Sequence, residues 1–405
     1  MNNVKSDFPI LDKKIRDKTI TYLDSAASTQ KPKQVIHSIS EFLENSYENV
    51  HRGMNSLSID ATDLYEKSRD VAKSFINANS TNEIIFTRGA TDSINIIANS
   101  LAEHLNKGDK IVVTELEHHS NYLPWMHLCK KLKLELKIIP ISKEGILSED
   151  EIINNCDDTT KVLSLTHMSN VTGQILDIKK IKQEINKDIY VAVDGCQSIA
   201  HLNIDVKDLN CDFYSFSSHK LYGPSGIGIM FGKEDILNQL NPPTLGGGMI
   251  NEVSSNDFSY AMLPNKFEPG TPSIEAAIGF KAAMEYLNNI NYQDYFSNEK
   301  KLRSTLISAL NDFEEIEIYG SNDNGNATSI VSFNIKNQNF NDIATFLDQY
   351  GIMIRGGHHC CQPFMKKLGI PGSCRVSFGI YNDINDIDHF VDSMKKTLKL
   401  LQHGR

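Results

Sequence analysis

From about residue 83 to residue 231, short apolar runs rich in β-branched residues alternate with longer segments in which apolar residues recur every three or four positions. The first pattern predicts buried strands, and the second predicts amphipathic helices. The predicted strands are 83–86, 110–114, 134–140, 162–166, 189–193, 211–215 and 227–231. The predicted helices between them are 92–105, 122–132, 148–155 and 178–186. Such alternation is typical of an α/β fold whose mostly parallel central sheet has helices on both faces.

The pattern changes on both sides of this region. Helical spacing also predicts helices at 31–48, 57–78 and 273–288, whereas 241–273 is rich in Gly, Pro, Asn and Ser and predicts a loop with room for a hairpin. Beyond residue 292 the predicted strands are 327–334, 351–355 and 375–378, and the predicted helices are 341–350 and 384–401. We therefore predict a large α/β domain at 22–291 and a smaller α+β domain made of 1–21 and 292–405.

The composition is that of an ordinary soluble globular protein. The 405 residues are 40% apolar and 23% charged, which is enough chain for two domains with sizeable cores. A net charge of −10 disfavours a nucleic-acid partner, and no apolar run approaches the length of a membrane span. Seven cysteines, without paired CxxC motifs at zinc spacing, favour reduced thiols and no structural metal. Because the polar start also lacks a signal-peptide core, we expect a cytoplasmic protein without nucleic-acid or membrane partners.

Polar side chains stand at the ends of two β-like runs. Asp194 ends the first, and Lys220 ends the second, directly before a glycine-rich turn. In an open α/β sheet, ligand groups gather outside the carboxyl ends of the strands. A lysine can form a Schiff base with a carbonyl cofactor, and a carboxylate can hold the protonated ring nitrogen of pyridoxal phosphate (PLP), while Gln197 can donate to its phenolate. Alone, each residue has an ordinary explanation, as a loop lysine or a helix N-cap. Together they favour a PLP site.

The turn at 87–93 joins a predicted strand to a predicted helix. Free backbone N–H groups and the positive end of the helix dipole favour an anion at such a turn, and Thr91 adds a hydroxyl. In isolation, Thr91 or Asp92 would simply cap the helix. The turn belongs to the same predicted sheet as Asp194 and Lys220, so we expect it to hold the phosphate of the cofactor. Further candidates for the phosphate are Ser217 and His219.

The segment 354–363 places thiols beside two imidazoles, after a strand and a glycine pair. Imidazole and guanidinium neighbours favour the nucleophilic thiolate, which makes Cys360 a candidate nucleophile. Zinc binding is a weaker interpretation, because adjacent residues of one loop rarely all reach one tetrahedral centre. Further along, Arg375 opens a predicted strand, and arginine is the natural bidentate partner of a substrate α-carboxylate. Without the rest of the site, Arg375 would be read as a surface ion-pair residue.

Nearly end to end, the motifs resemble the fold-type-I PLP-dependent enzymes of the class V aminotransferase-like family, and within them the group II, SufS-type cysteine desulfurases. The matching motifs are YLDSAASTQKP at 22–32, NVHRG at 49–53, EHHSN at 117–121, HMSN at 167–170, SSHK at 217–220 and GTP at 270–272. The segment from Arg355 to Cys360 resembles the RxGHHC motif of group II, whereas group I enzymes have a longer, serine-rich loop. The resemblance implies the fold of a fold-type-I PLP-dependent transferase and a homodimer with active sites at the subunit interface.

The resemblance also implies a role for each matching residue. Lys220 would carry PLP as a Schiff base and move protons, His118 would stack on the cofactor ring and assist proton transfer, and Cys360 would attack the substrate sulfur. The other cofactor contacts would come from Asp194, Gln197, Thr91, Ala90, Ser217, His219 and the partner subunit's Thr271. Arg375, with Asn170, would bind the carboxylate of the substrate. Arg355 would lie near the loop that carries Cys360, and His51 and Arg52 would lie near the neighbouring subunit's site.

The implied function is conversion of L-cysteine to L-alanine, with transfer of the sulfur to Cys360 as a persulfide. A SufE-like or SufU-like acceptor would then take the sulfur for Fe–S cluster assembly. A selenocysteine lyase, which releases selenide and L-alanine, is the nearest alternative, because selenide can leave without a loop thiol. A PLP transaminase would have no use for Cys360, and a sulfur-relay or scaffold protein without catalysis would have no use for Lys220 and Asp194.

Three positions depart from the family pattern. Ser218 stands where relatives often have glycine, Ala90 where some have threonine, and Cys361 where many have a residue without a thiol. The first two departures remove no catalytic group. Cys361 is a second thiol able to compete for the persulfide, so the choice between Cys360 and Cys361 stays open at the level of sequence.

Overall fold

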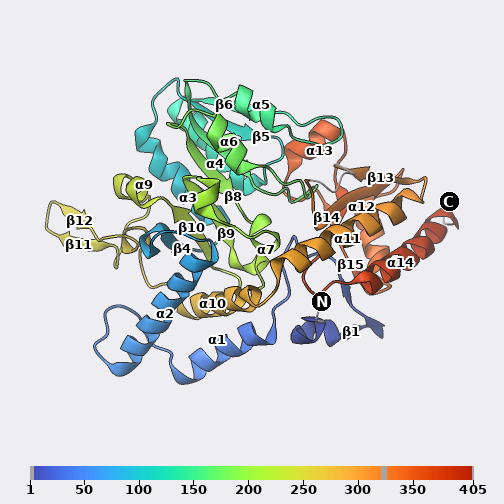
Figure 1. Ribbon diagram of the computed structural model, residues 1–405, viewed down its shortest axis with the longest axis horizontal. Helices are drawn as coiled ribbons and strands as arrows, with labels where there is room; N and C mark the ends of the chain where they lie inside the picture. Colours follow the sequence, from blue (N-terminus) through green and yellow to red (C-terminus); the bar gives the residue numbers. More distant parts are fainter. Residues whose placement is uncertain (1–3, 321–325, 404–405) are drawn as a thin grey trace.

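A seven-stranded sheet forms the centre of the computed structural model, which describes residues 4–320 and 326–403 (Figure 1). The strand order is β4-β10-β9-β8-β7-β5-β6. The strands are β4 (Ile84–Thr87), β5 (Lys110–Thr114), β6 (Glu135–Ile139), β7 (Thr160–Thr166), β8 (Tyr190–Asp194), β9 (Phe213–Ser217) and β10 (Gly228–Gly232). Strands β5 to β9 are mutually parallel, and β10 runs antiparallel between β4 and β9. The predicted α/β fold with a mostly parallel sheet is confirmed.

Helices cover both faces of this sheet. They are α1 (Lys33–Asn45), α2 (Ser56–Phe75), α3 (Ala90–Leu101), α4 (His119–Leu132), α5 (Glu149–Asn154), α6 (Ile178–Glu184), α7 (Ser198–His201), α8 (Val206–Leu209), α9 (Glu234–Gln239) and α10 (Ile274–Asn288). Alternate residues of β5 enter two different cores, Val112 with Leu163, and Ile111 and Val113 with Trp125. A strand buried on both faces reads as a continuous apolar run, which is the pattern of a parallel sheet.

A second, antiparallel sheet is built from the C-terminal part of the chain, on the right of Figure 1. Its strands, in order, are β13 (Ile316–Tyr319), β14 (Ile330–Ile335), β17 (Ser373–Ser377) and β16 (Arg355–Gly357). The surrounding helices are α11 (Tyr292–Asn311), α12 (Phe340–Asp348), α13 (Gln362–Leu368) and α14 (Ile384–His403). A separate core that includes Phe333, Leu347 and Phe390 holds this sheet to its helices.

The N-terminal segment contacts both parts of the molecule. Its strand β3 (Thr21–Tyr22) pairs in parallel with β15 (Ile352–Met353), and the Lys5 ammonium lies 2.8 Å from the Asp386 carboxylate on α14. The Phe8 ring, in contrast, lies between Tyr222 of the main body and Tyr381. The division into domains at 22–291 and at 1–21 with 292–405 stays a prediction.

Some elements differ from the sequence prediction. Strand β9 ends at Ser217, so Lys220 lies in the 3-10 turn that follows and not in the strand. The predicted strand 351–355 consists of two short strands in different sheets, because β15 pairs with β3 and β16 pairs with β17. Strand β13 and helix α13 were not predicted. The long loop contains the exposed hairpin β11 (Ile250–Val253) and β12 (Phe258–Tyr260).

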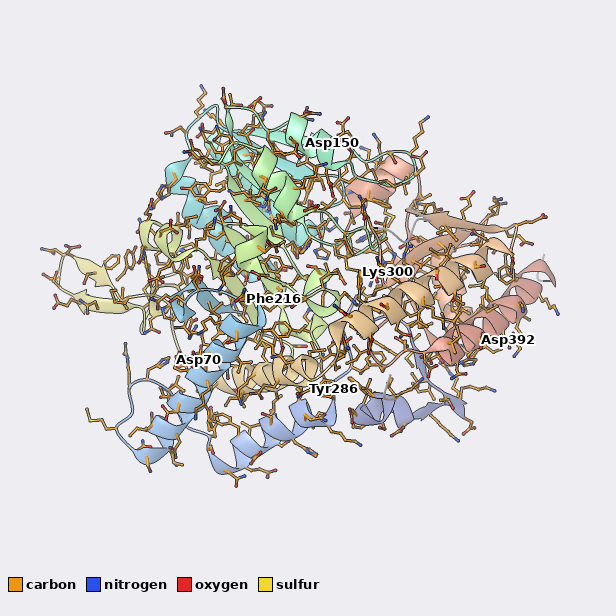
Figure 2. The ribbon with its side chains drawn as sticks, in the orientation of Figure 1. Asp70, Asp150, Phe216, Tyr286, Lys300 and Asp392 are labelled. Carbon is orange, nitrogen blue, oxygen red and sulfur yellow. The ribbon has the colours of Figure 1, made fainter. Side chains whose placement is uncertain are left out.

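Figure 2 shows Phe216 inside the main body, where its side chain is fully buried, while Asp150 and Asp392 lie at the periphery. Within residues 4–320 and 326–403, no helix combines the length and the apolar character needed to cross a bilayer.

Candidate active site

A cavity of about 220 Å³ lies where the carboxyl ends of β7, β8 and β9 approach the segment that follows β16. Most of the predicted site residues line it: Ala90, Thr91, His118, Asn170, Asp194, Gln197, Ser217, His219, Lys220, Arg355, Cys360 and Arg375. The structure therefore brings together residues from the sheet edge and residues from the C-terminal sheet. Lining residues that sequence reasoning did not single out as site residues are Ala26, Ala27, Ser120, Thr166, Met168, Cys196 and His359.

Two adjacent parallel strands, β8 and β9, position the Asp194 carboxylate and the Lys220 amine. Asp194 is the last residue of β8, buried, and its Oδ1 accepts a hydrogen bond of 2.9 Å from the Cys196 N–H. Because β9 is parallel to β8, Ser217 ends at the same edge, and Lys220 follows in the next turn. The Gln197 side chain donates to the Ala26 carbonyl at 3.0 Å and so also fastens the N-terminal segment over the cavity.

The turn before α3 contributes Ala90 and Thr91 to the lining of the cavity. Gly89 caps the helix with φ of 147°, and the Ala90 N–H donates to Ser217 Oγ at 2.8 Å. Thr91 Oγ1 lies 2.7 Å from Ser120 Oγ. A Cβ on Gly228 would come within 2.6 Å of Gly89 Cα, so the glycine lets this turn lie against β10. The helix N-terminus and the hydroxyls together form a site suited to an anion.

His118 is a neutral ring at this site. Burial, with the charge of Lys220 adding to it, lowers its pKa to about 3. Its Nδ1 accepts a hydrogen bond of 3.1 Å from the Ser120 N–H, so the single ring proton is on Nε2. Burial next to Lys220 likewise lowers the pKa of His219 to about 4. Both imidazoles are therefore uncharged at neutral pH.

Hydrogen bonds to two adjacent residues, His359 and Cys360, fasten the middle of the thiol loop, residues 354–363. The His119 N–H donates to the Cys360 carbonyl at 2.7 Å, and the Asn170 side chain donates to the His359 carbonyl at 2.8 Å. The His359 ring lies 3.0 Å from the Ser373 carbonyl. His359 and Cys360 have φ of 52° and 53°, in the left-handed region that non-glycine residues rarely adopt. Such backbone persists where the surroundings hold it, as these contacts do here.

The two neighbouring thiols point in different directions. Cys360 is exposed and lines the cavity, whereas Cys361 is fully buried and its Sγ contacts the Glu115 carbonyl at 3.7 Å. Burial raises the pKa of the Cys361 thiol well above its usual range. The thiolate is the nucleophilic form of cysteine, so of this pair Cys360 is the one placed to react.

Arg375 supplies the anion-binding side of the cavity from β17. It is buried, and its Nη1 donates to the Asn170 carbonyl at 3.0 Å. Within the described part of the chain its Nε has no hydrogen-bond partner. Its Nη2 lies 3.2 Å from Oδ1 of Asp24, whose Oδ2 lies 3.4 Å from Nε of Arg355. Sequence reasoning missed Asp24 as a functional residue, and its position inside the motif at 22–32 was the only signal.

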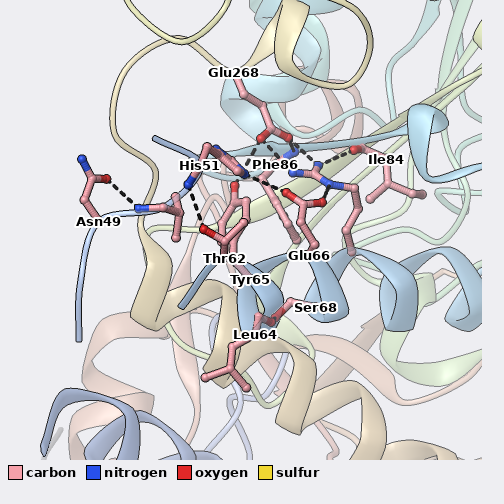
Figure 3. Close-up of polar contacts among 12 residues, drawn as sticks. Asn49, His51, Thr62, Leu64, Tyr65, Glu66, Ser68, Ile84, Phe86 and Glu268 are labelled. Carbon is pink, nitrogen blue, oxygen red and sulfur yellow. Dashed lines mark hydrogen bonds and ion pairs between the residues drawn. The ribbon is translucent and has the colours of Figure 1, made fainter. Parts of the chain in front are cut away.

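The remaining predicted site residues lie elsewhere in this chain: Thr271, His51 and Arg52. Thr271 and Glu268 line a second cavity of about 390 Å³. This cavity is larger than the first, but Lys220, Asp194 and Cys360 do not line it. Glu268 forms a two-pronged ion pair with buried Arg69, at 2.6 and 3.0 Å. Figure 3 shows the same network extending to His51, whose Nε2 lies 2.9 Å from Glu66. Their predicted place beside a partner's site stays a prediction.

The donor set fits PLP. A buried carboxylate, an amine, a neutral imidazole and a hydroxyl-lined helix N-terminus meet the needs of the ring nitrogen, the aldehyde, the ring face and the phosphate. The unpartnered Nε of Arg375 in the described structure is a donor left for a substrate carboxylate. No cluster of three His, Cys, Asp or Glu side chains among the described residues is arranged to hold a metal ion.

The chain has clear relatives. A sequence profile of the aminotransferase class-V family matches residues 21–390. A probable cysteine desulfurase of Staphylococcus epidermidis is 42% identical over 402 residues, 99% of this chain and 97% of that one. The Staphylococcus aureus protein of the same name is 42% identical over 405 residues, 100% of this chain and 98% of that one.

Solved structures agree with these matches. A cysteine desulfurase from Thermococcus onnurineus superimposes with a TM-score of 0.93 at 35% identity and covers 98% of this chain and 97% of its own. The cysteine desulfurase CsdA from Escherichia coli, in an S-sulfonic acid form, gives a TM-score of 0.89 at 32% identity, with 98% of each chain covered.

Proposed function

The chain belongs to the aminotransferase class-V family and is a PLP-dependent cysteine desulfurase, and from this premise we propose that it transfers the sulfur of L-cysteine to Cys360 and releases L-alanine. One observation carries the proposal: the exposed Cys360 lines the same cavity as Lys220, Asp194 and Arg375. A transaminase needs the last three groups but has no use for a thiol there.

The residues of the sheet edge hold the cofactor in this proposal. Lys220 binds its aldehyde, Asp194 its ring nitrogen and His118 its ring face. The hydroxyl of Ser217, with the first turn of α3, holds its phosphate. When bound, PLP supplies the electron sink that makes the bonds at the substrate α-carbon labile.

The remaining side chains position the substrate and move protons. Arg375 binds the α-carboxylate, while Lys220 removes the α-proton and moves protons within the site. The neutral His118 ring carries its hydrogen on Nε2, which suits hydrogen-bond donation inside the cavity. The Cys360 thiolate then attacks the substrate sulfur. A new S–S bond forms, the C–S bond breaks, and its electron pair stays with the three-carbon fragment, which is protonated to L-alanine.

The sulfur held on Cys360 must leave for turnover to continue. Because this thiol is exposed, a second protein can reach it, and we infer that a SufE-like or SufU-like acceptor takes the sulfur for Fe–S cluster assembly. We also infer a cytoplasmic homodimer in which the partner subunit's Thr271 completes the phosphate site. Thr271 lines the second cavity and not the one that contains Lys220, so in this proposal a second subunit brings its own Thr271 to the phosphate site.

Mass spectrometry after incubation with L-cysteine tests the choice of thiol. We expect L-alanine to form and one extra sulfur atom to appear on Cys360, both in the wild type and in Cys361→Ala. In Cys360→Ala the extra sulfur should be absent and alanine should form at least about a hundredfold more slowly. Wild-type rates in Cys360→Ala, or an extra sulfur on Cys361, would contradict the mechanism. L-selenocysteine as a second substrate separates a selenocysteine lyase, whose rate does not need Cys360.

A further inference from the structure

One buried carboxylate beside the second cavity is held by several segments, and Figure 3 shows its contacts. The Glu268 side chain is only 8% exposed, and its two oxygens accept hydrogen bonds from Arg69 at 2.6 and 3.0 Å. The Phe86 N–H on β4 donates to it at 2.7 Å, and the Tyr65 hydroxyl on α2 donates to it at 3.2 Å. Glu268 is thus fixed to a strand and to a helix of the main body.

Arg69 is held as firmly as its partner. Its side chain is fully buried, its guanidinium carbon lies 4.6 Å from the centre of the Phe86 ring, and its Nη1 donates to the Ile84 carbonyl at 2.7 Å. Its Nε lies 3.0 Å from Glu66, whose other oxygen lies 2.9 Å from His51. Burying two charges costs hydration energy that offsets much of their attraction, so such a pair fixes chiefly geometry.

The anchored carboxylate sets the start of the segment that carries Thr271. Thr271 is exposed and stands three residues after Glu268. Between them, Gly270 has φ of 88°, in the left-handed region that favours glycine, and its N–H donates to the Gly247 carbonyl at 2.7 Å. A short segment fixed at Glu268 and at Gly270 leaves Thr271 little freedom, so a change at the buried carboxylate displaces the exposed hydroxyl.

The phosphate end of the active-site cavity lies close to the second cavity. Thr91 and Ser217, which line the active-site cavity, also line an outer cavity of about 540 Å³. This outer cavity is lined in addition by Arg88 and Asp92, which also line the second cavity. The residues proposed to hold the phosphate and the residue Thr271 therefore stand beside neighbouring cavities, although Thr271 does not line the active-site cavity of its own chain.

Apolar side chains are exposed near this network in the sequence. Those that follow His51 or precede Glu268 are Met54, Leu57, Ile59, Leu245 and Met262. Exposed apolar groups of this size are typical of interaction surfaces. A second copy of this chain suits the surface, because a two-fold interface uses the same face of both subunits and exchanges equivalent contacts between them. Each subunit can then offer its Thr271 to the phosphate end of the other.

We propose that Glu268 is a positioning residue that acts across the subunit interface: through its ion pair with Arg69 it places Thr271 for the partner subunit's phosphate site, and it does not act on the site of its own chain. The proposal rests on the proposed function in one respect, namely a homodimer in which each Thr271 completes the phosphate site of the other subunit. Hydrogen bonds to charged groups are strong enough for the loss of one to be measured as weaker binding of PLP.

Mixed dimers distinguish action on the partner from action within the chain. Each contains one Lys220→Ala subunit, so PLP can be bound by a lysine only in the other subunit. In the joined dimer, the Lys220→Ala subunit also carries Glu268→Gln, and the other subunit is wild type. In the split dimer, Glu268→Gln is on the subunit that keeps Lys220. Two different affinity tags isolate each mixed dimer.

Titration of the PLP-free dimers with PLP, read from the absorbance of the lysine-bound cofactor, gives the dissociation constant of the one site that keeps Lys220. We expect binding about tenfold weaker in the joined dimer, because its site receives Thr271 from a Glu268→Gln subunit. The split dimer should agree within about twofold with a mixed dimer of Lys220→Ala and wild-type subunits. Equal dissociation constants in the joined and split dimers, as a merely structural role would give, or weaker binding in the split dimer alone, overturn the proposal.

Two further variants control this result. Glu285→Gln removes an exposed carboxylate that pairs with Lys281, and in place of Glu268→Gln it should leave the joined and split dimers alike. If subunits with Glu268→Gln do not fold, Glu268→Asp takes its place. It keeps the charge but draws the carboxylate back by one methylene from Arg69 and Phe86, and the same difference between the two dimers decides.

Failure of this proposal and failure of the proposed function look different. A wrong function appears as a dimeric wild type that makes no L-alanine and gains no sulfur from L-cysteine. A wild type that elutes as a monomer in size-exclusion chromatography overturns the homodimer and this proposal together. A wrong role for Glu268 appears as an active, dimeric wild type whose joined and split dimers bind PLP equally.

Discussion

The two sides of the active-site cavity are built in different ways. On the sheet side, Asp194 ends a buried parallel strand and Lys220 follows its neighbour, so the backbone ladder fixes both positions. On the loop side, Cys360 lies in a segment of positive φ, held chiefly by hydrogen bonds such as that from Asn170 to the His359 carbonyl. The first side is part of the core of the fold, and the second is attached to it by a few polar contacts.

The difference separates two kinds of information. The sheet side provides the groups that hold the cofactor, while the loop side determines which bond of the substrate is broken. Because the loop depends on a few polar contacts, changes on that side should alter the reaction and leave the cofactor site intact. Changes on the sheet side should abolish both. Four experiments test this contrast.

The largest effect is expected on the sheet side. Lys220→Ala removes the amine that binds PLP and carries protons, so activity should fall by at least about a thousandfold. The characteristic absorbance of the lysine-bound cofactor should disappear as well. Lys179→Ala, which removes an exposed lysine paired with Asp208, is the matched control. A Lys220→Ala protein that kept this absorbance would show that the cofactor is anchored elsewhere.

A pH effect on stability is expected from the loop side. Burial, with Arg375 adding to it, lowers the pKa of His359 to about 2, against about 6.5 in the unfolded chain. Below pH 6.5 the unfolded state therefore binds a proton that the folded state does not, and stability falls as the pH drops. The expected loss is about 1.4 kcal/mol for each pH unit, down to the folded pKa.

Replacing His359 by glutamine removes this contribution and keeps a side chain able to donate to Ser373. The loss of unfolding free energy between pH 6.5 and 4.5 should then be smaller by about 2 to 3 kcal/mol than in the wild type. Denaturant unfolding at both pH values measures it. Parallel pH profiles for the two proteins would mean that His359 is not held neutral in the fold.

A smaller, kinetic effect is expected from the contact that fastens the loop. Asn170→Ala removes the hydrogen bond to the His359 carbonyl, so the thiol is less well placed and kcat should fall by about tenfold. The cofactor absorbance should not change. If KM rises while kcat is unchanged, Asn170 acts on the substrate carboxylate, as the sequence resemblance implied, and not on the loop.

The smallest effect is expected at the neighbouring thiol. Cys361→Ala removes a buried sulfur that contacts the Glu115 carbonyl, which should cost about 1 kcal/mol of stability. Turnover should stay within about twofold of the wild type, as measured by alanine release. A loss of tenfold or more would show that Cys361 takes part in the reaction.

The sheet side could be predicted from sequence because its residues are tied to local patterns. Apolar runs mark the strands, and the polar residues that follow them must lie at one edge if the strands are parallel. The position of Asp194 at the end of β8 agrees with this reasoning. Strand β9 lies two residues further along the chain than predicted, and Lys220 stands three residues beyond its end, in the 3-10 turn that follows.

The orientation of the thiols in the loop and the contact of Asp24 with Arg375 could not be predicted in the same way. Whether Cys360 or Cys361 faces the cavity depends on left-handed backbone at His359 and Cys360, which side-chain patterns do not specify. The contact of Asp24 with Arg375 joins residues far apart in the chain, and it requires the pairing of β3 with β15. Hydrophobic periodicity gives strands but not their partners, which is also why the split of 351–355 was missed.

The pairing of β3 with β15 has a consequence for the synthesis of the protein. Every strand of the seven-stranded sheet lies between residues 84 and 232, so a growing chain can assemble this sheet early. Asp24 and β3 leave the ribosome before that sheet exists, yet their partners around Arg355 and Arg375 emerge only near the end of translation. An unfinished chain can thus bring Asp194 and Lys220 together, but the substrate-binding part of the cavity forms only after Arg355 and Arg375 have been synthesised.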